Sequence, residues 1–396
     1  GKELDAEDVV QTIKLLKNDA FKYPYLSNLR FLRDVEKIDR FTLKLSLAFP
    51  FAAWKNYLTF KILNSREIKS FPPDNFRDRI LTGTGPFKIK SINRPSKIIL
   101  EPNDANLSSK TGSHPGEGKN PLLEYIVIAS PQISPLKLLA KEIDICELQP
   151  ETAEAYSHTM PEWHEGFHIL KYKKFGYTYL VFNLKNSLIT RNLRCLFYNE
   201  LINGDFLDRF LMGRGERVIS PFLLLNDNIK TGQFDIPLPN TPIQLKILTN
   251  SESKLRKELV TFLREKLKPF KVLLQPVYAE YHTFLDYLKN GRFDIAISAY
   301  MLDMDYDLSD ILAGYGFFNY ARFQNQGMDS LLEQGLKESD PRKREKIYLD
   351  AHHLWLENLP FLPLFNLYYY VGVSRDMEIP LQTFEVVGSE GDFLYN

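Results

Sequence analysis

Cysteine, long apolar runs and an excess of either charge are all scarce in this sequence. Only two cysteines occur among 396 residues, and neither Cys146 nor Cys195 stands in a CxxC or zinc-ligand spacing, so we interpret both as small core residues. No apolar run approaches the ~20 residues of a transmembrane helix. Lys and Arg together number 50, as do Asp and Glu, which argues against a nucleic-acid or polybasic membrane surface as the main functional site.

Motifs of common catalytic and metal sites are also missing. The sequence contains no GxSxG or HExxH, and its GTGPF motif lacks the GK[ST] that follows in a P-loop. Asp303, Asp305 and Asp307 match the first three acidic positions of an EF-hand loop. However, Leu308 replaces the glycine of the sharp turn, and Gly314 replaces the bidentate Glu. These absences favour a protein that is not an enzyme, with no cofactor and no bound metal.

A regular alternation of strands and helices stands out in the third quarter of the sequence. Apolar periodicity predicts strands at 243–250, 271–278 and 292–302. The intervening segments, 251–270 and 281–291, have helical periodicity instead. This β-α-β-α-β order requires a parallel sheet with helical crossovers.

Helix and strand signals are also clear nearer the two ends of the chain. Asp5 is predicted to cap the helix that follows it, with Asp8 three residues later. Residues 37–50 alternate between apolar and polar side chains, which predicts a strand. Asp340 followed by Pro341 marks the start of another helix.

Two distant segments of the chain, 135–148 and 284–298, resemble each other. Each combines a short amphipathic helix, a turn and a buried strand that opens with an acidic residue, Asp144 in the first and Asp294 in the second. Two equivalent units at this separation favour two α/β lobes of related topology.

The segment YMLDMDYDLSDIL, residues 300–312, contains four aspartates and no Lys or Arg. It follows the last strand of the predicted β-α-β-α-β region. In open α/β sheets, ligands bind at the carboxyl ends of the strands. We therefore expect this acidic segment to contribute to a ligand site. The structural alternative is that its aspartates, Asp307 and Asp310 above all, only turn the chain into a helix.

Six segments along the chain carry a resemblance to a known family. They are LDAEDVVQTIKLL, GTGPFKIK, LAKEIDI, YLVFNLKNSLITRNLRCLFYNEL, LKNGRFDIAIS and MDSLLEQGLKESDPRKREKIYLDAHHLWLENLPFLPLF. Through them the sequence resembles the family 5 extracellular solute-binding proteins, the peptide- and nickel-binding receptors of ABC importers. The resemblance implies an α/β fold of periplasmic-binding-protein-like type II. In that fold, two α/β lobes around mixed sheets, with an additional smaller subdomain, enclose a hinged cleft.

The resemblance also implies a domain organisation and a cellular location. Residues 1–82 correspond to part of a variable subdomain, 83–185 and 361–396 to the first lobe, and 186–360 to the second, ligand-binding lobe. A signal peptide, a lipid-anchor cysteine or both, and the first strands of the main lobe, are expected ahead of Gly1. The expected protein is a monomer, periplasmic or membrane-anchored outside the cytoplasm, that delivers its ligand to ABC permease subunits and binds no nucleic acid.

In peptide-binding members of this family, an aspartate in a W-x-x-D-Y-P-D-P-x-x-F-L pattern pairs with the α-ammonium of the ligand. Tyr300 stands in place of the Trp and makes Asp303 the equivalent aspartate. Matching from the other end of the pattern makes Asp305 the nearer candidate, and because the prolines are missing, both residues stay open. A carboxylate in a partly desolvated cleft favours a ligand ammonium, since a charge-assisted hydrogen bond then replaces lost hydration.

Further site residues follow from the same resemblance. Aromatic walls suit peptide sites because they bury area with few rotamers lost, and Tyr179, Tyr300 and residues 368–370 are the predicted ones. For 368–370, ordinary strand packing is the alternative. Asn183 matches the family's FN asparagine, with a role either in ligand binding or in fixing the hinge. Arg194 matches the arginine of the family's R-Q-A-L helix and is predicted to form a lobe-organising ion pair.

The leading hypothesis is a substrate-binding receptor of an ABC importer that captures a peptide by hinge closure. One alternative is the ligand-sensing domain of a regulatory protein with the same fold. Another is a receptor for nickel or a different small solute, for which His158, His164 and His168 are the residues to consider.

Overall fold

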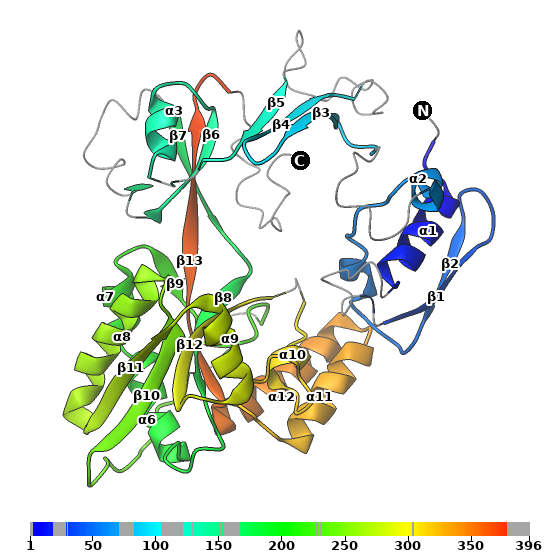
Figure 1. Ribbon diagram of the computed structural model, residues 1–396. Coiled ribbons are helices and arrows are strands. Elements are labelled where there is room, and N and C mark those ends of the chain that lie inside the picture. Colours follow the sequence, from blue (N-terminus) through cyan, green and yellow to red (C-terminus); the bar gives the residue numbers. More distant parts are fainter. Residues whose placement is uncertain are drawn as a thin grey trace. The chain divides into compact units, whose positions relative to one another are not determined.

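The chain forms two compact units in the computed structural model shown in Figure 1. Unit 1 comprises Gly1–Tyr172 and Tyr369–Asn396, and unit 2 comprises Lys173–Tyr368. The finer, three-part division expected from the sequence stays a prediction. The residues whose structure is described are 3–18, 29, 31–70, 83–103, 122–128, 130, 132–150, 152–153, 167–225, 229, 231–302 and 305–377.

Unit 1 is built from short elements. Its strands form an antiparallel hairpin, β1–β2, and an antiparallel three-stranded sheet, β3-β4-β5, while β6 and β7 pair with the long strand β13. The elements are α1 (Ala6–Leu16), β1 (Leu32–Lys37), β2 (Leu43–Leu47), η3 (Trp54–Tyr57), α2 (Ser65–Ser70), β3 (Phe87–Asn93), β4 (Lys97–Pro102), β5 (Leu123–Ile126), α3 (Ser134–Leu139), β6 (Ile145–Leu148), β7 (Phe167–Lys173) and the end of β13 (Phe361–Ser374).

The start of α1 confirms the predicted cap. The Asp5 carboxylate accepts a hydrogen bond from the Glu7 N–H at 3.0 Å, and the Asp8 carboxylate accepts one from the Asp5 N–H at 3.0 Å. The second oxygen of Asp8 accepts the N–H of Ser65 at 2.8 Å, which ties α2 to the start of α1. A local capping motif therefore also fixes a tertiary contact.

The strand predicted over residues 37–50 is wrong in its first part. Lys37 is the last residue of β1 and Leu43–Leu47 form β2, because the chain turns between these two strands. The Asp39 carboxylate accepts the N–H groups of Phe41 and Thr42, both at 2.8 Å, and thereby stabilises the turn. Aspartate commonly bonds the main chain two residues on, and that local bond outweighs the apolar alternation.

Unit 2 contains the larger sheet. Its strand order is β11-β10-β12-β8-β13, with β9 paired to β13. The elements are β8 (Gly176–Phe182), α6 (Arg191–Leu201), α7 (Phe206–Leu211), β9 (Gly215–Arg217), β10 (Ile243–Asn250), α8 (Lys254–Leu267), η6 (Lys268–Phe270), β11 (Val272–Ala279), α9 (Tyr281–Asn290), β12 (Ile295–Met301), α10 (Ser309–Leu312), α11 (Gln326–Lys337), α12 (Pro341–Asn358) and most of β13.

The predicted β-α-β-α-β region is confirmed. Strands β10, β11 and β12 are parallel, and helices α8 and α9 make the crossovers between them. The sheet is mixed rather than purely parallel, because β8 runs antiparallel to β12 and β13 runs antiparallel to β8. The carboxyl ends of β10, β11 and β12 therefore share one edge of the sheet.

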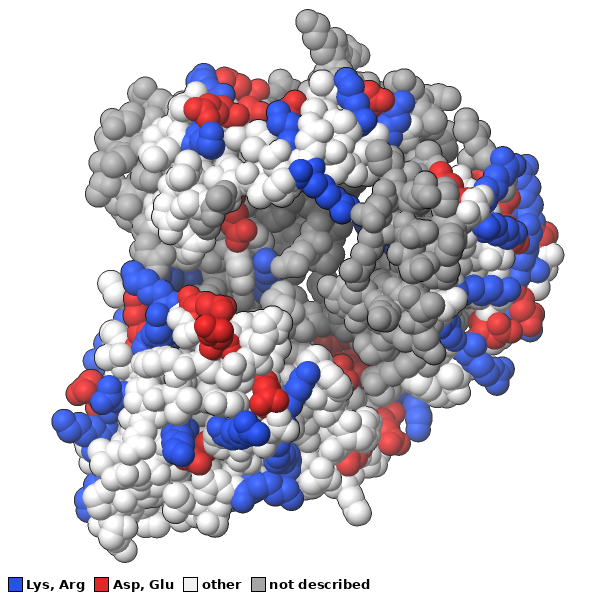
Figure 2. All heavy atoms as spheres, in the orientation of Figure 1, with Lys and Arg blue, Asp and Glu red and all other residues white. Residues whose placement is uncertain are grey.

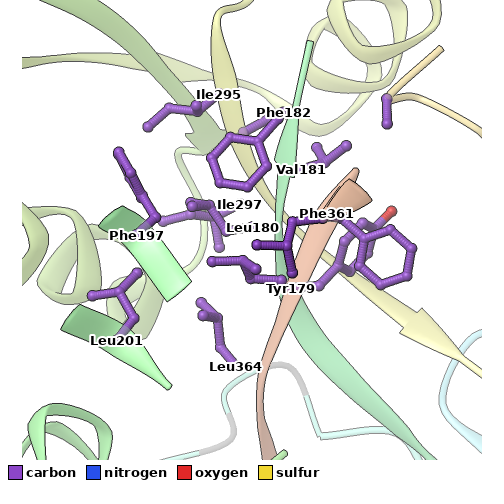
Figure 3. Close-up of a cluster of buried hydrophobic side chains, with 14 of the residues drawn as sticks. Tyr179, Leu180, Val181, Phe182, Phe197, Leu201, Ile295, Ile297, Phe361 and Leu364 are labelled. Carbon is purple, nitrogen blue, oxygen red and sulfur yellow. The ribbon is translucent and has the colours of Figure 1, made fainter. Parts of the chain in front are cut away.

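The core of unit 2 forms where α6 covers the central strands (Figure 3). Every residue of β8 is buried. The rings of Phe182 and Phe197 meet edge to face, with their centroids 5.4 Å apart, and Leu180 and Ile297 are fully buried beside them. Burying side chains of this size contributes about 1.5–3 kcal/mol each.

Two further predictions about the core and the helices are confirmed. Cys146 and Cys195 are both buried and unpaired. The Asp340 carboxylate accepts the N–H groups of Arg342 and Lys343 at the start of α12, with proline in the first helical turn.

The surface carries both signs of charge. On the face shown in Figure 2, basic and acidic side chains lie intermixed over the described residues. None of the helices in the described ranges combines the length and apolar character needed to cross a membrane.

Candidate functional site

The acidic segment follows directly from β12 in unit 2. The N–H of Leu302 donates to the carbonyl oxygen of Phe175 at 2.8 Å, which holds the segment's first residues beside the chain that enters β8. The segment therefore starts at the carboxyl edge of the parallel strands, as predicted. Asp303, one of the two predicted amine partners, lies outside the described residues.

Asp305, the other predicted amine partner, is buried with 6% of its surface exposed. Its two carboxylate oxygens accept hydrogen bonds from the guanidinium of Arg344, at 2.6 and 2.8 Å. This parallel two-bond arrangement is among the strongest ion pairs that side chains form. The negative charge of Asp305 is thus already matched by a cation of the protein.

Arg344 makes further contacts that fix its orientation. Its Nε donates to the carbonyl oxygen of Gly335 in α11 at 2.8 Å. Its guanidinium carbon lies 5.6 Å from the ring centre of Tyr306 and 5.2 Å from that of Tyr348, and these two rings stack on each other 5.2 Å apart. Burial alone would lower the pKa of Arg344, but the hydrogen bonds and charge of Asp305 raise that pKa above its ordinary value. Arg344 therefore stays charged although it is buried.

The rest of the acidic segment is organised by its own carboxylates. Asp305 accepts the N–H of Asp307 at 2.9 Å, and Asp307 accepts the N–H of Ser309 at 2.9 Å. These two bonds turn the chain into α10, with Asp310 in its first turn. The helix-starting role predicted as the alternative for Asp307 and Asp310 therefore agrees with the local geometry.

The predicted aromatic wall residues differ in exposure. Tyr179 is only 2% exposed and packs edge to face against Phe361, 5.4 Å away, so the structure gives it a core position. Tyr300 is half-buried, and its ring lies 5.7 Å from that of Phe318. Of residues 368–370, the first two are half-buried and the third is buried. Contact of these residues with a ligand stays a prediction.

Asn183 lies directly after β8 and is nearly buried. Its amide nitrogen donates to the carbonyl oxygens of Gly291 and Phe293, at 3.1 and 2.9 Å, and its oxygen accepts the N–H of Lys185 at 3.2 Å. Both amide hydrogens are therefore used to hold the turn between α9 and β12. Of the two predicted roles, this geometry favours the structural one.

Arg194 organises the start of α6, and no ion pair to it, the interaction that was predicted, occurs among the residues that the structure describes. Its guanidinium donates to the main-chain carbonyl oxygens of Asn358, at 3.0 Å, and Ile189, at 2.9 Å. One carbonyl oxygen at the end of α12 and one just before α6 therefore serve where a carboxylate was expected.

Sequence reasoning missed Arg344, although α12 carries the signal for it. The buried residues of this helix follow helical spacing along one face, and Arg344 is the first of them. A charged residue at the start of a buried face needs a partner, because an unpaired buried charge is costly. The full buried set is Arg344, Tyr348, Ala351, His352 and Trp355.

The histidines considered for a metal are not assembled in the described part of the chain. His158 and His164 lie outside the described residues, whereas His168 lies in β7. No group of three or more His, Cys, Asp and Glu side chains within the described ranges is arranged to hold a metal ion.

The arrangement of the sheet and the similarity to solved structures define the class of protein. The chain has the fold of the type II periplasmic binding proteins of family 5. It resembles the structure of NikZ from Campylobacter jejuni, in complex with Ni(L-His), with a TM-score of 0.76 and 20% sequence identity, over 95% of this chain and 80% of that one.

The sequence comparisons agree with this class. Residues 1–195 match the family described as bacterial extracellular solute-binding proteins, family 5 middle. The oligopeptide-binding protein AppA of Bacillus subtilis is 22% identical over 96% of this chain and 75% of its own length. The probable D,D-dipeptide-binding periplasmic protein DdpA of Escherichia coli is 21% identical over 87% and 69%. The chain belongs to the family 5 extracellular solute-binding proteins of ABC importers.

Proposed function

We propose that this chain is the substrate-binding receptor of an ABC importer, that its ligand is a peptide, and that Asp303 pairs with the free amino terminus of that peptide. The observation that carries the choice of residue is the ion pair between Asp305 and Arg344. Because the charge of Asp305 is matched within the protein, Asp303 is the better of the two predicted partners for a ligand cation. The names of AppA and DdpA, which are binding proteins rather than enzymes, support the peptide class.

We further propose that the ligand contacts both units and shifts a hinge equilibrium towards the closed state. Two compact units joined by only two chain passages, between residues 172 and 173 and between 368 and 369, support this proposal. A ligand shifts such an equilibrium by its difference in affinity for the two states. Transport would then require the ABC permease subunits as partners outside the cytoplasm, where the family's proteins act.

Capture of an ammonium by a carboxylate gives a simple chemical selectivity. A free amino terminus carries a positive charge and donates charge-assisted hydrogen bonds, whereas an N-acetylated terminus is neutral. Hydrogen bonds to a charged group are worth about 1.5–3 kcal/mol. Acetylation should therefore weaken binding by roughly 10- to 100-fold.

The test begins with the ligand itself. The protein is purified under native conditions, and small molecules that copurify are identified by mass spectrometry. The protein is then offered a pentapeptide library with free amino termini, mixed with an equal amount of its N-acetylated form. We define the amine ratio as the amount of retained free peptide divided by the amount of retained N-acetylated peptide.

We expect an amine ratio of at least about 10 for the unaltered protein and a ratio near 1 for Asp303→Asn. The matched control is Asp310→Asn, which removes a charge from the same segment at a residue of α10 and should keep the unaltered ratio. Retention of both peptide forms in equal amounts by the unaltered protein would refute amine capture. Retention of neither form would refute the peptide class.

A further inference from the structure

Unit 1 contains a small cavity between α1 and β1, lined by residues that the proposed function does not use. Its volume is about 220 Å³, below the ~300–1,000 Å³ of pockets that enclose drug-sized ligands, so the cavity suits a small ligand. The apolar part of its lining consists of buried side chains, those of Ile13, Leu32 and Val35. The rest of its lining is exposed and charged: Lys14, Lys17, Arg33 and Asp34.

The charges at this cavity are unbalanced. Three positive side chains and one negative side chain give its lining a net charge of +2. Lys14 and Arg33 have no ion pair and no side-chain hydrogen bond with any residue in the described ranges. Lys14 and Lys17 are three residues apart on α1, where neighbouring like charges destabilise a helix slightly. An anion bound between them would remove this repulsion.

Lys17 is held in position by the main chain of β1. Its Nζ donates to the carbonyl oxygens of Leu32, at 2.6 Å, and Arg33, at 3.2 Å. An ammonium has three N–H donors, so one remains for a ligand. Because carbonyl oxygens and not a carboxylate fix this ammonium, its orientation is set while its charge is kept.

An irregularity in β1 brings Arg33 and Asp34 to the cavity together. The pairing of β1 with β2 shifts register between Leu32 and Asp34, so Arg33 is an extra residue in the ladder. In a regular strand, successive side chains point to opposite faces, and one of these two would face the core. Instead both are exposed, while Leu32 and Val35 on either side of them are buried. Bulges of this kind re-aim side chains and often lie next to functional sites.

Stabilisation of α1 does not by itself explain the cluster. Cations near the end of a helix interact favourably with the helix dipole, and Lys14 and Lys17 occupy that position. Arg33 belongs to β1, however, so the dipole does not account for an unpaired arginine there.

We infer that this cavity binds a phosphate-type oxyanion, as free phosphate or as the headgroup of a phospholipid. A phosphate group carries about one to two negative charges and several strong acceptor oxygens. These match the net charge of the lining and the unused donors of Lys14, Lys17 and Arg33.

The first arm of the test measures binding of inorganic phosphate to the full chain by calorimetry, at low and constant ionic strength. We expect Arg33→Gln to weaken phosphate binding by about three- to fivefold, because one exposed cation is lost. We expect Asp34→Asn to strengthen it by a similar factor, because the one acid of the lining is removed. The asparagine side-chain oxygen can still accept the Val35 N–H that Asp34 accepts at 2.8 Å.

The matched control is Arg66→Gln, which removes an exposed arginine of α2 in the same unit that does not line the cavity. It should leave phosphate binding unchanged, and circular dichroism checks that each variant is folded. Equal weakening by Arg66→Gln and Arg33→Gln would show general attraction to a charged surface and would overturn the inference. Weaker phosphate binding in Asp34→Asn would overturn it too.

The second arm distinguishes the two sources of phosphate. The protein is floated with phosphatidylcholine vesicles that contain or lack phosphatidic acid, whose headgroup is a bare phosphate. Binding to phosphatidic acid that Arg33→Gln weakens would identify a lipid headgroup, whereas phosphate binding without vesicle binding would identify the free ion. No Arg33-dependent binding in either arm would overturn the inference. The amine ratio is measured separately, so the proposed function does not depend on this result.

Discussion

Two buried polar sites on the same face of α12 differ in how their hydrogen-bonding groups are matched. At Arg344 the charge and hydrogen bonds are met by Asp305 and Gly335. Two turns later, His352 is 1% exposed, and only its Nδ1 has a partner, the hydroxyl of Ser220 at 3.0 Å. Its Nε2 has no partner among the described residues.

The difference shows what a buried polar group requires. A charge is kept inside the protein only with a complete set of partners, whereas a titratable group with an incomplete set stays neutral. The complete site includes Asp305, two residues after Asp303 in the sequence, and the incomplete one lies against Trp355 in the core of unit 2. The predictions below test this contrast, starting with the largest effect.

The largest effect is expected from breaking the ion pair on one side only. Arg344→Met leaves Asp305 as an unmatched buried charge, which should lower the free energy of unfolding by about 3–5 kcal/mol. Urea denaturation followed by circular dichroism measures this loss. The double variant of Asp305→Leu and Arg344→Met should recover most of it, and no recovery would contradict the account of a charge left unpaired.

The next effect is a pH dependence that comes from His352. Burial, with a smaller contribution from the charge of His353, lowers the pKa of His352 from 6.5 to about 4 in the folded protein. As the pH falls below 6.5, the unfolded state therefore binds a proton that the folded state does not, and stability is lost until about pH 4. The shift corresponds to about 3 kcal/mol.

This pH effect is measured by comparing the unaltered protein with His352→Gln between pH 7 and pH 4. Other groups titrate similarly in both proteins, so their difference isolates the histidine. The free energy of unfolding should fall more steeply for the unaltered protein. Parallel curves would show that His352 does not titrate as described.

A smaller effect should follow from crowding the tyrosine that packs beside Arg344. In Gly335→Ala the new methyl group lies 2.5–2.8 Å from atoms of Tyr348, so the ring must shift. Overpacking of this kind costs about 1–3 kcal/mol. Gly204→Ala, where the nearest atom would be 3.8 Å away, is the control and should change the unfolding free energy much less.

The smallest effect is expected from two tyrosines of β8 that differ in the same way as the two sites on α12. The Tyr177 hydroxyl has no hydrogen-bond partner among the described residues, whereas the Tyr179 hydroxyl bonds Ser298. Tyr179→Phe should therefore cost about 1 kcal/mol, while Tyr177→Phe should be neutral or slightly stabilising. The free energies of unfolding are measured by chemical denaturation. Equal losses in the two variants would contradict the difference between the two hydroxyls.

Local signals in the sequence predicted much of the fold. The caps at Asp5 and Asp340 follow from bonds between residues two or three apart, and the β-α-β-α-β region follows from apolar periodicity over long segments. Local bonds also explain why the strand expected over residues 37–50 was wrong in its first part. The hydrogen bonds that the Asp39 carboxylate accepts decide where the hairpin turns.

The candidate site could be placed but not completed from the sequence. The acidic segment follows the strand as predicted, because that position depends on chain order. The partner of Asp305 is Arg344, 39 residues away, and nothing in the local spacing of charges connects them. The choice between Asp303 and Asp305 depended on this distant contact, so spacing alone left both open.

The central claim is tested most directly by a thermodynamic cycle between Asp303 and the ligand's amino group. Calorimetry is carried out with the pentapeptide that the protein retains best, in its free and N-acetylated forms, on the unaltered protein and on Asp303→Asn. The account predicts that either change alone weakens binding and that the second adds little, with a coupling energy of about 1.5–3 kcal/mol. If the losses of binding free energy from Asp303→Asn and from N-acetylation simply add, that result would contradict pairing of Asp303 with the ammonium.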